Sequence, residues 1–122
     1  MLRLISFDID GTLEVGDPPG SITIDMVRQA KANGWLVGSC SDRGTSAQKL
    51  LWDRAELEVD FMVMKQQLDS VRAKFPDADN YLHIGDTDVD RWFADKAGFD
   101  FIHIEEAHLV DWLRELGPFR EF

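Results

Sequence analysis

An apolar run near the start of the chain ends in two carboxylates, and this feature constrains the fold most. The run from Leu4 to Phe7 leads directly into Asp8 and Asp10, and a Gly-Thr turn follows. Apolar runs of this length that are bounded by a turn signal are typical of buried strands. Carboxylates at the end of a buried strand are costly unless a positive partner neutralises them. We therefore expect Asp8 and Asp10 to face a metal ion or a reacting phosphate group.

Four more apolar runs follow the first one, and segments with helical spacing separate them. We predict strands over residues 3–8, 35–40, 59–64, 80–84 and 99–104. Thr23 can cap the first helix, which Gly34 ends, and Thr45 or Ser46 begins the second. Strands that alternate with helices are typical of βαβ units, in which helices cover both faces of a parallel sheet. The chain is therefore predicted to be an α/β protein with three layers.

The apolar residues of each helical pattern predict which face packs inward. The inward stripe of the second helix is expected to consist of Ala47, Leu50 and Leu51. The third pattern is marked by Leu68, Val71 and Phe75. The fourth pattern, which Gly98 ends, is marked by Val89, Trp92, Phe93, Lys96 and Ala97. The last pattern is marked by Leu109, Val110, Leu113 and Leu116. These patterns predict helix packing against the sheet, with Trp92 near the end of the fourth strand.

Length and composition limit the classes of protein to which the chain can belong. Its connections are short, so we expect one domain over residues 1–122. The formal charge of -10 argues against a nucleic-acid surface. We find no signal-peptide pattern and no apolar run of membrane-spanning length, and we expect a cytoplasmic protein without membrane contact. The only cysteine, Cys40, is expected to be a buried small residue, and His83 a core histidine.

The predicted strand ends carry a set of chemically related side chains. In a parallel α/β sheet, ligands bind outside the carboxyl ends of the strands. In chain order these ends supply Asp8, Asp10, Ser41, Lys65, Asp86 and Asp90. Such a set can hold a divalent cation together with a phosphate, because Mg²⁺ prefers hard oxygen ligands. Asp86 and Asp90 are expected to hold the metal from the side opposite the first strand.

Each of the other four residues has a chemical role that its position suggests. Asp8 lies directly at the strand end and can form an aspartyl-phosphate as a nucleophile. Asp10 can protonate a leaving oxygen and later activate water. Ser41 can donate a hydrogen bond to a phosphoryl oxygen, and Lys65 supplies a compact positive charge for Asp8 and the phosphate.

Four segments resemble the motifs of the haloacid dehalogenase (HAD) superfamily of phosphatases. The sequence DIDGTL at 8–13 is similar to its first motif, and SDR at 41–43 is similar to its second. Lys65, after an apolar run, resembles the third motif, and GDTDVD at 85–90 resembles the fourth. The resemblance extends from Leu4 to about Ile104, with all four motifs in family order.

The resemblance implies a Rossmann-like sheet with strand order 5-4-1-2-3, a Mg²⁺ cofactor and an aspartyl-phosphate intermediate. It implies that Asp8 is the nucleophile and a metal ligand, and that Asp10 is the general acid and base and contacts metal through its backbone carbonyl. Ser41 and Lys65 would bind the phosphate.

The remaining implications concern the metal and the reaction. The resemblance implies that Asp86 is a metal ligand and that Asp90 supports the metal directly or through water. The second carboxylate of the first motif, Asp10, favours hydrolysis of phosphate esters over dehalogenation. The expected function is therefore that of a Mg²⁺-dependent phosphohydrolase acting on a phosphate monoester.

The chain also departs from the usual family pattern. Members of the superfamily usually insert a cap domain near the site, but here the segments between the motifs hold only a loop and single helices. We expect a capless member with an open site, covered only by residues 14–22 or by a neighbouring copy in a homo-oligomer. The sequence assigns no class to the phosphorylated substrate.

Several assignments have competing interpretations in the sequence. Ser39 competes with Ser41 for the phosphate, and Lys74 competes with Lys65. Arg43 fits both a contact to substrate phosphate and a surface salt bridge. The two acids of the fourth motif also suit a helix N-terminus, where acidic side chains are favoured.

Two other functions compete with hydrolysis. A phospho-accepting receiver domain has its acceptor aspartate at the third strand end, where this chain has Lys65, and its lysine at the fifth, where this chain has Ile-His-Ile at 102–104. The order of residues therefore argues against a receiver. A catalytically idle member used as a binding or assembly subunit is the other alternative, and the intact motif residues argue against it.

Overall fold

A computed structural model describes residues 2–107, 112 and 113. Within these residues the strands form one parallel sheet of five. The strands are β1 (Arg3–Phe7), β2 (Leu36–Ser41), β3 (Phe61–Met64), β4 (Asn80–Gly85) and β5 (Asp100–His103). Their order across the sheet is β3-β2-β1-β4-β5, which is the expected order 5-4-1-2-3 when it is counted from the β5 edge. The predicted α/β class with a parallel sheet is confirmed, and the arrangement is compatible with a Rossmann-like fold.

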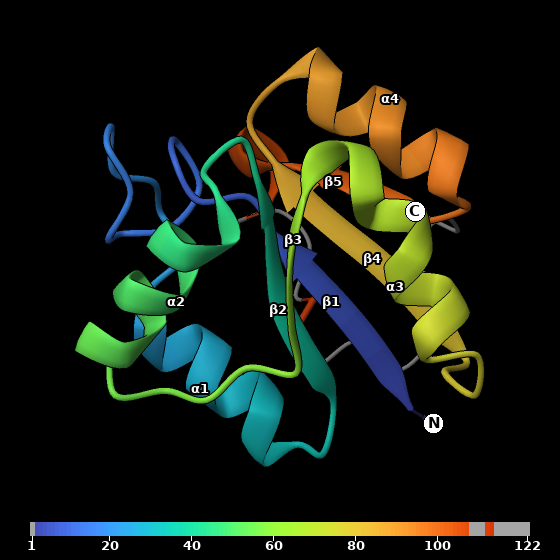
Figure 1. Ribbon diagram of the computed structural model, residues 1–122, viewed down its shortest axis with the longest axis horizontal. Coiled ribbons are helices and arrows are strands. Elements are labelled where there is room, and N and C mark those ends of the chain that lie inside the picture. Colours follow the sequence, from blue (N-terminus) through green and yellow to red (C-terminus); the bar gives the residue numbers. More distant parts are fainter. Residues whose placement is uncertain (1, 108–111, 114–122) are drawn as a thin grey trace.

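Helices cover both faces of the sheet (Figure 1). The structure has α1 (Ile24–Ala32), α2 (Thr45–Arg54), α3 (Leu68–Lys74) and α4 (Asp88–Ala97), with 3-10 turns η1 (Lys65–Gln67) and η2 (Ile104–Glu106). Side chains of α1 and α2 pack on one face, and those of α3 and α4 pack on the other. None of the helices in the described part of the chain is both long enough and apolar enough to cross a membrane.

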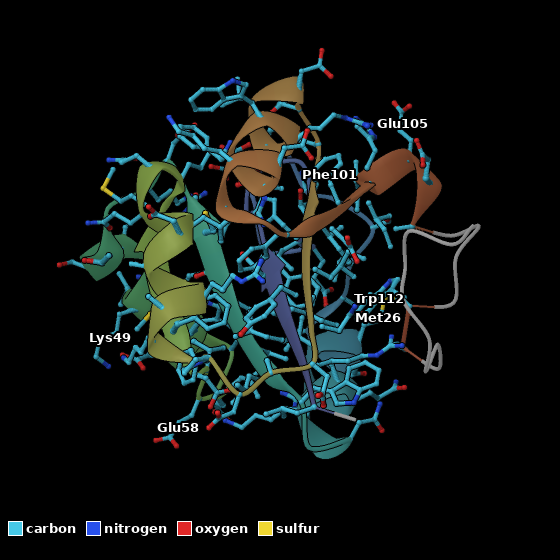
Figure 2. All side chains as sticks on the ribbon, turned by 90° about the vertical axis from the view of Figure 1, so that its right-hand side faces the viewer. Met26, Lys49, Glu58, Phe101, Glu105 and Trp112 are labelled. Carbon is cyan, nitrogen blue, oxygen red and sulfur yellow. The ribbon has the colours of Figure 1, made fainter. Side chains whose placement is uncertain are left out.

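The central strand explains why the layers form. Leu4, Ile5 and Phe7 of β1 are completely buried, because alternate side chains face opposite helical layers. Phe7 contacts Trp112 edge-on, with ring centroids 5.5 Å apart. Figure 2 shows Trp112 beside Met26 of α1, and both belong to the same apolar cluster. Trp112 therefore extends the core beyond the strands. Leu113, one of the residues that mark the predicted final helix, also packs against this cluster. The other three, Leu109, Val110 and Leu116, lie outside the described residues.

The predicted ends of two helices are confirmed by their caps. The Thr23 side chain accepts a hydrogen bond from the Met26 amide at 3.1 Å and begins α1. Gly98 ends α4 in the left-handed conformation, with φ of 79°. The Thr23 cap fixes the position at which α1 begins. Gly98 fixes the position at which α4 ends, before the chain enters β5.

The predicted inward face of α2 is partly wrong, because only Leu51 of its three predicted residues is buried. Ala47 and Leu50 are exposed, and the buried residues of α2 are Gln48, Leu51 and Trp52. Counting apolar residues misses this rotation, because the Gln48 amide is satisfied by the Arg43 and Val63 carbonyls at 2.8 and 2.9 Å. A polar side chain with buried partners thus faces the core beside Leu51, whereas Ala47 and Leu50 do not.

The predicted inward face of α4 is also partly wrong. Val89 and Trp92 are 52% and 55% exposed, whereas Asp90, Ala94 and Ala97 are buried. The helix is rotated because Asp90, predicted as a metal ligand or as a helix N-terminal residue, is held in the interior by polar partners. Trp92 instead packs against Phe93 and Lys96 on the outer side.

Candidate functional site

The polar residues predicted from the strand ends meet at one edge of the sheet. Asp8 follows β1, Ser41 ends β2, Lys65 follows β3 and Asp86 follows β4. Parallel pairing of β1 with β2 and β4, and of β2 with β3, brings these positions together. The Asp8 amide donates to the Ile84 carbonyl at 2.9 Å, which holds this aspartate against the end of β4.

Lys65 is the positive charge that the buried carboxylates share. Its Nζ lies 3.6 Å from Asp8 Oδ2 and 3.4 Å from Asp90 Oδ1, and all three residues are buried. Asp42 Oδ2 also lies 3.6 Å from this Nζ, but its side chain is exposed. Burial alone would lower the pKa of Lys65, yet the nearby carboxylates raise it above its ordinary value. Lys65 is therefore charged at neutral pH.

Three carboxylates form a cluster that could hold a metal ion. Asp8, Asp86 and Asp90 each offer an oxygen, and these oxygens lie within 4.8 Å of one another. Two glycines allow this approach: a Cβ at Gly11 would lie 1.9 Å from Asp86 Oδ2, and one at Gly85 would lie 2.4 Å from Asp90 Cγ. Three oxygen donors of this kind fit a hard divalent cation such as Mg²⁺. The Mg²⁺ cofactor itself stays a prediction.

The electrostatics of the cluster oppose the simultaneous ionisation of its carboxylates. Burial, reinforced by the charge of Asp90, raises the pKa of Asp8 from 3.8 to about 8, although Lys65 opposes the shift. The hydrogen bond with Asp86 contributes to the same upward shift of the pKa. One ammonium group cannot balance three carboxylates, and the raised pKa favours the protonated form of Asp8. A divalent cation would take the place of the proton and favour the ionised carboxylate.

Asp90 is fixed by a buried polar chain that the sequence did not indicate. Its Oδ1 lies 2.9 Å from His83 Nε2, and His83 Nδ1 lies 2.9 Å from Ser6 Oγ. Thr87 donates to Asp90 Oδ2 through its amide and its hydroxyl. Burial alone would raise the pKa of Asp90, but the His83 hydrogen bond and the nearby charges hold it below its usual range. His83 is buried as predicted, and it also orients Asp90.

The side chain of Asp10 makes its hydrogen bonds outside the cluster of Asp8, Asp86 and Asp90. Arg43 donates to both of its oxygens, from Nη2 at 2.6 Å and from Nε at 3.1 Å, and the Asp17 amide donates at 2.8 Å. The hydrogen bonds from Arg43 are the main reason that the pKa of Asp10 lies below its ordinary value. Arg43 and Asp10 lie 33 positions apart, so no local spacing predicts their pairing. The predicted salt bridge of Arg43 is present in the structure, and its contact to substrate phosphate stays a prediction.

The structure distinguishes Ser41 and Lys65 from Ser39 and Lys74, the residues that compete with them for the phosphate in the sequence. The Ser39 hydroxyl is buried between β2 and α2, where it contacts Gln48 Oε1 at 2.5 Å and Trp52 Nε1 at 3.0 Å. Lys74 lies on α3 over the Phe75 ring, at 5.6 Å from its centroid. Ser41 is buried at the strand end, and its Oγ accepts from the Arg43 amide at 3.1 Å.

The segment after the first carboxylates folds back on itself. The Gly11 amide donates to the Pro18 carbonyl at 2.6 Å, and the Glu14 amide donates to the Ile22 carbonyl at 2.8 Å. Glu14 Oε2 also accepts from the Ile24 amide at 2.5 Å, which joins the loop to the start of α1. Residues 14–22 are thus held beside the predicted nucleophile.

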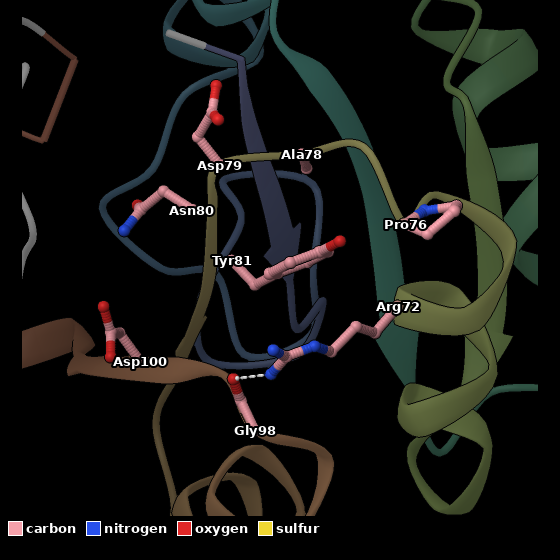
Figure 3. Close-up of a pocket in the computed structure, with 8 residues that line it drawn as sticks. All are labelled: Arg72, Pro76, Ala78, Asp79, Asn80, Tyr81, Gly98 and Asp100. Carbon is pink, nitrogen blue, oxygen red and sulfur yellow. Dashed lines mark hydrogen bonds between the residues drawn. The ribbon is translucent and has the colours of Figure 1, made fainter.

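The described residues line several cavities, two of which lie near the segments that bear on the site or at the starts of strands. One of about 530 Å³ adjoins Arg43, between residues 14–24 and α2. The other, of about 300 Å³, opens near the starts of β4 and β5 (Figure 3). There Arg72 Nη1 donates to the Gly98 carbonyl at 2.7 Å and the guanidinium lies over the Tyr81 ring. Because ligands of parallel sheets bind at the opposite strand ends, the first cavity belongs with the site.

Comparison with known proteins gives no family assignment. No family model matches the chain, and no curated protein matches it significantly. The relation to the HAD superfamily therefore stays a proposal, which depends on the four motifs and on the arrangement of their residues.

Proposed function

We propose that the protein is a Mg²⁺-dependent phosphohydrolase that cleaves a phosphate monoester through an aspartyl-phosphate intermediate. The observation that carries the proposal is the position of Asp8. Its carboxyl group lies 3.6 Å from Lys65 Nζ and within 4.8 Å of oxygens of Asp86 and Asp90. A carboxylate flanked by an ammonium group and by metal ligands is suited to attack a phosphoryl group.

The roles of the metal ligands follow from the donor set. Asp8, Asp86 and Asp90 would hold Mg²⁺, with the Asp10 backbone carbonyl as a further ligand. The bound ion would neutralise charge on the phosphoryl oxygens and lower the pKa of Asp8. Lys65 Nζ and the Ser41 hydroxyl would bind the remaining phosphoryl oxygens.

The reaction then has two balanced steps. In the first, an Asp8 oxygen bonds to phosphorus, the bond from phosphorus to the ester oxygen breaks, and Asp10 gives its proton to that oxygen. In the second, a water oxygen bonds to phosphorus while Asp10 takes a proton from that water. The bond between Asp8 and phosphorus breaks, which regenerates the carboxylate and releases inorganic phosphate.

The ion pair between Asp10 and Arg43 must open for the first step. Arg43 holds Asp10 in its ionised form, whereas the general acid must carry a proton. Both side chains are about one-third exposed, and ion pairs of such exposure are weak. We expect the bound substrate to draw Arg43 away and so allow Asp10 to be protonated.

A capless form of the superfamily suits the short connections. The segment between β1 and β2 holds a loop and α1, and the segment between β2 and β3 holds α2. We propose that residues 14–22, or a neighbouring copy in a homo-oligomer, exclude water from the site instead of a cap domain.

Phosphate release from a generic aryl phosphate tests the proposed function. We expect release that requires MgCl₂, is abolished by EDTA and is lost in Asp8→Asn, which preserves side-chain size. Beryllofluoride, which mimics an acyl phosphate, is expected to bind at Asp8. If the wild-type protein releases no phosphate from any ester in Mg²⁺, or if beryllofluoride binds elsewhere, the proposal is wrong.

One observation favours the alternative of a binding or assembly subunit without catalysis. Arg43 engages both oxygens of Asp10, so the proposed general acid has no proton in the resting structure. An idle protein would still bind Mg²⁺ and phosphate at the carboxylate cluster. It would show ligand-induced stabilisation without turnover, and this result separates the two functions.

A further inference from the structure

A groove beside Arg43 has unusual exposed apolar side chains. It encloses about 530 Å³, within the range of small-molecule sites. Its lining is made by Glu14, Val15, Ile24, Arg43, Ala47, Leu50, Leu51, Arg54 and Ala55. Across the described residues, large apolar side chains are exposed at Val15, Leu50, Val89 and Trp92, and the first two line this groove. Ala47 and Leu50, which the sequence assigns to the core, therefore face an open cavity.

The position of the groove relates it to the proposed reaction. Arg43 forms part of its wall and also donates to both carboxylate oxygens of Asp10. Asp10 is the residue proposed to protonate the leaving oxygen. A substrate whose ester oxygen contacts Asp10 therefore has its leaving group beside Arg43, at the mouth of the groove.

The charges of the wall indicate the kind of leaving group. Arg43 is paired with Asp10, and the Glu14 carboxylate accepts from the Ile24 amide. The Arg54 side chain has no ion pair within the part of the chain that the structure describes. An acidic protein thus presents one available guanidinium group next to an apolar surface. An apolar body with a negative group at its far end complements this wall.

We propose that the groove between residues 14–24 and α2 binds the leaving group of the phosphate monoester and selects an aromatic one that carries a carboxylate. This inference rests on the proposed phosphohydrolase function. The aromatic body contacts Val15, Ala47 and Leu50, and the carboxylate pairs with Arg54. The groove thereby performs the recognition that a cap domain would otherwise provide.

Steady-state kinetics with three substrates test the selection. We compare 4-carboxyphenyl phosphate, phenyl phosphate and glycerol 3-phosphate in Mg²⁺. Leu50→Ser is expected to lower kcat/KM for both aryl esters by about tenfold and to leave glycerol 3-phosphate within about twofold. Val89→Ser is the matched control, because Val89 is an apolar helix residue with 52% exposure against 51% for Leu50. Equal effects of the two variants would overturn the proposal.

A second pair of variants tests the charge. Arg54→Gln is expected to lower kcat/KM for 4-carboxyphenyl phosphate about fivefold and to leave phenyl phosphate unchanged. Lys49→Gln removes the same charge from α2 outside the groove, and it should affect the two aryl esters equally. An equal loss of kcat/KM for both aryl esters in Arg54→Gln would contradict the carboxylate contact.

Binding of 4-hydroxybenzoate, the product of 4-carboxyphenyl phosphate hydrolysis, tests the groove independently of catalysis. We expect 4-hydroxybenzoate to shift the amide NMR signals of Val15 and Leu50, and the shifts to vanish in Leu50→Ser. Shifts confined to the cavity around Arg72 and Tyr81, or no shifts, would overturn the proposal. A dimer that covers the groove, detected by light scattering and dissociated by Leu50→Ser, would also overturn it. Binding without phosphate release would refute the hydrolase function and retain the groove.

Discussion

Asp8 and Asp10 lie two positions apart but have opposite environments. Burial and neighbouring carboxylates raise the pKa of Asp8 to about 8, whereas the hydrogen bonds from Arg43 lower that of Asp10. The fold thus favours the protonated form of the proposed nucleophile and the ionised form of the proposed general acid. Each residue reaches its reactive form only when a ligand changes its partner. Catalysis is therefore expected to depend on both metal and substrate before the first bond forms.

The raised pKa of Asp8 predicts that stabilisation by Mg²⁺ depends on pH. In the metal-free protein, the contribution of Asp8 to stability is fully present below its ordinary pKa of 3.8 and is lost as the pH rises through about 8. Mg²⁺ binds the ionised form and must displace the proton. At a fixed MgCl₂ concentration, the rise in Tm should be larger at about pH 9 than at about pH 6. Asp8→Asn should abolish this difference, and an equal rise at both pH values in the wild type would contradict the metal site.

The contact between Gly11 and Asp86 predicts a specific loss of metal affinity. Gly11→Ala would place a Cβ 1.9 Å from Asp86 Oδ2 and displace that proposed metal ligand. Gly34→Ala is the matched control, because Gly34 also has positive φ but has nothing within 4 Å of its Cβ position. Both variants should lose about 1 kcal/mol of stability from backbone strain. Only Gly11→Ala should weaken Mg²⁺ binding in a calorimetric titration, and equal affinities would refute the assignment of Asp86.

At the scale of elements, α2 and α4 are both rotated from the faces that their apolar residues predict. Polar residues with buried partners, Gln48 and Asp90, take the inward positions. The rotation of α2 exposes Leu50 to the groove, and the rotation of α4 brings Asp90 within reach of Lys65. In each helix a buried polar residue occupies the inward face. This exception to the apolar pattern shapes both the proposed leaving-group groove and the carboxylate cluster.

The orientation of α2 can be tested through Gln48. Gln48→Leu keeps a similar volume but leaves the Arg43 and Val63 carbonyls without their donor. We expect a loss of about 1–3 kcal/mol in the free energy of unfolding, because unpaired buried carbonyls are costly. Urea denaturation measures the change, and Ala47→Gln on the exposed side of α2 should be nearly neutral. A neutral Gln48→Leu would show that its hydrogen bonds do not set the helix orientation.

At the scale of the molecule, the parallel sheet gathers distant residues at one edge while the whole chain carries an excess of negative charge. The formal charge is -10, from 23 acidic and 13 basic residues. Such an excess destabilises a compact state through self-repulsion. Part of this repulsion is concentrated at the carboxylate cluster, where a divalent cation would relieve it more effectively than dilute monovalent salt.

Salt dependence separates general screening from specific binding. In EDTA, the Tm should rise with KCl, because screening weakens repulsion among surface carboxylates. At equal ionic strength, MgCl₂ should raise the Tm further than KCl does. Asp86→Asn, which removes a proposed ligand, should reduce this excess while the KCl response persists. If MgCl₂ and KCl act equally at matched ionic strength, the cluster has no specific divalent site.

The sequence predicted the features that depend on local order along the chain. Alternation of apolar runs with helical patterns predicted the parallel α/β sheet and the strand ends that carry Asp8, Ser41, Lys65 and Asp86. Caps at Thr23 and Gly98 were also predicted, because they use neighbouring backbone groups. These features follow from short-range periodicity and turn chemistry.

Only the tertiary structure decided which distant side chains meet. It paired Arg43 with Asp10, joined Asp90 to His83 and Ser6, and turned Leu50 outward. Such contacts join residues far apart in the chain, and buried polar groups find partners there that no local pattern reveals. The positions of Asp8 and Asp10 after the first strand thus follow from the sequence. The opposite directions of their pKa shifts follow from the fold, since a pKa depends on the burial and charges around each group.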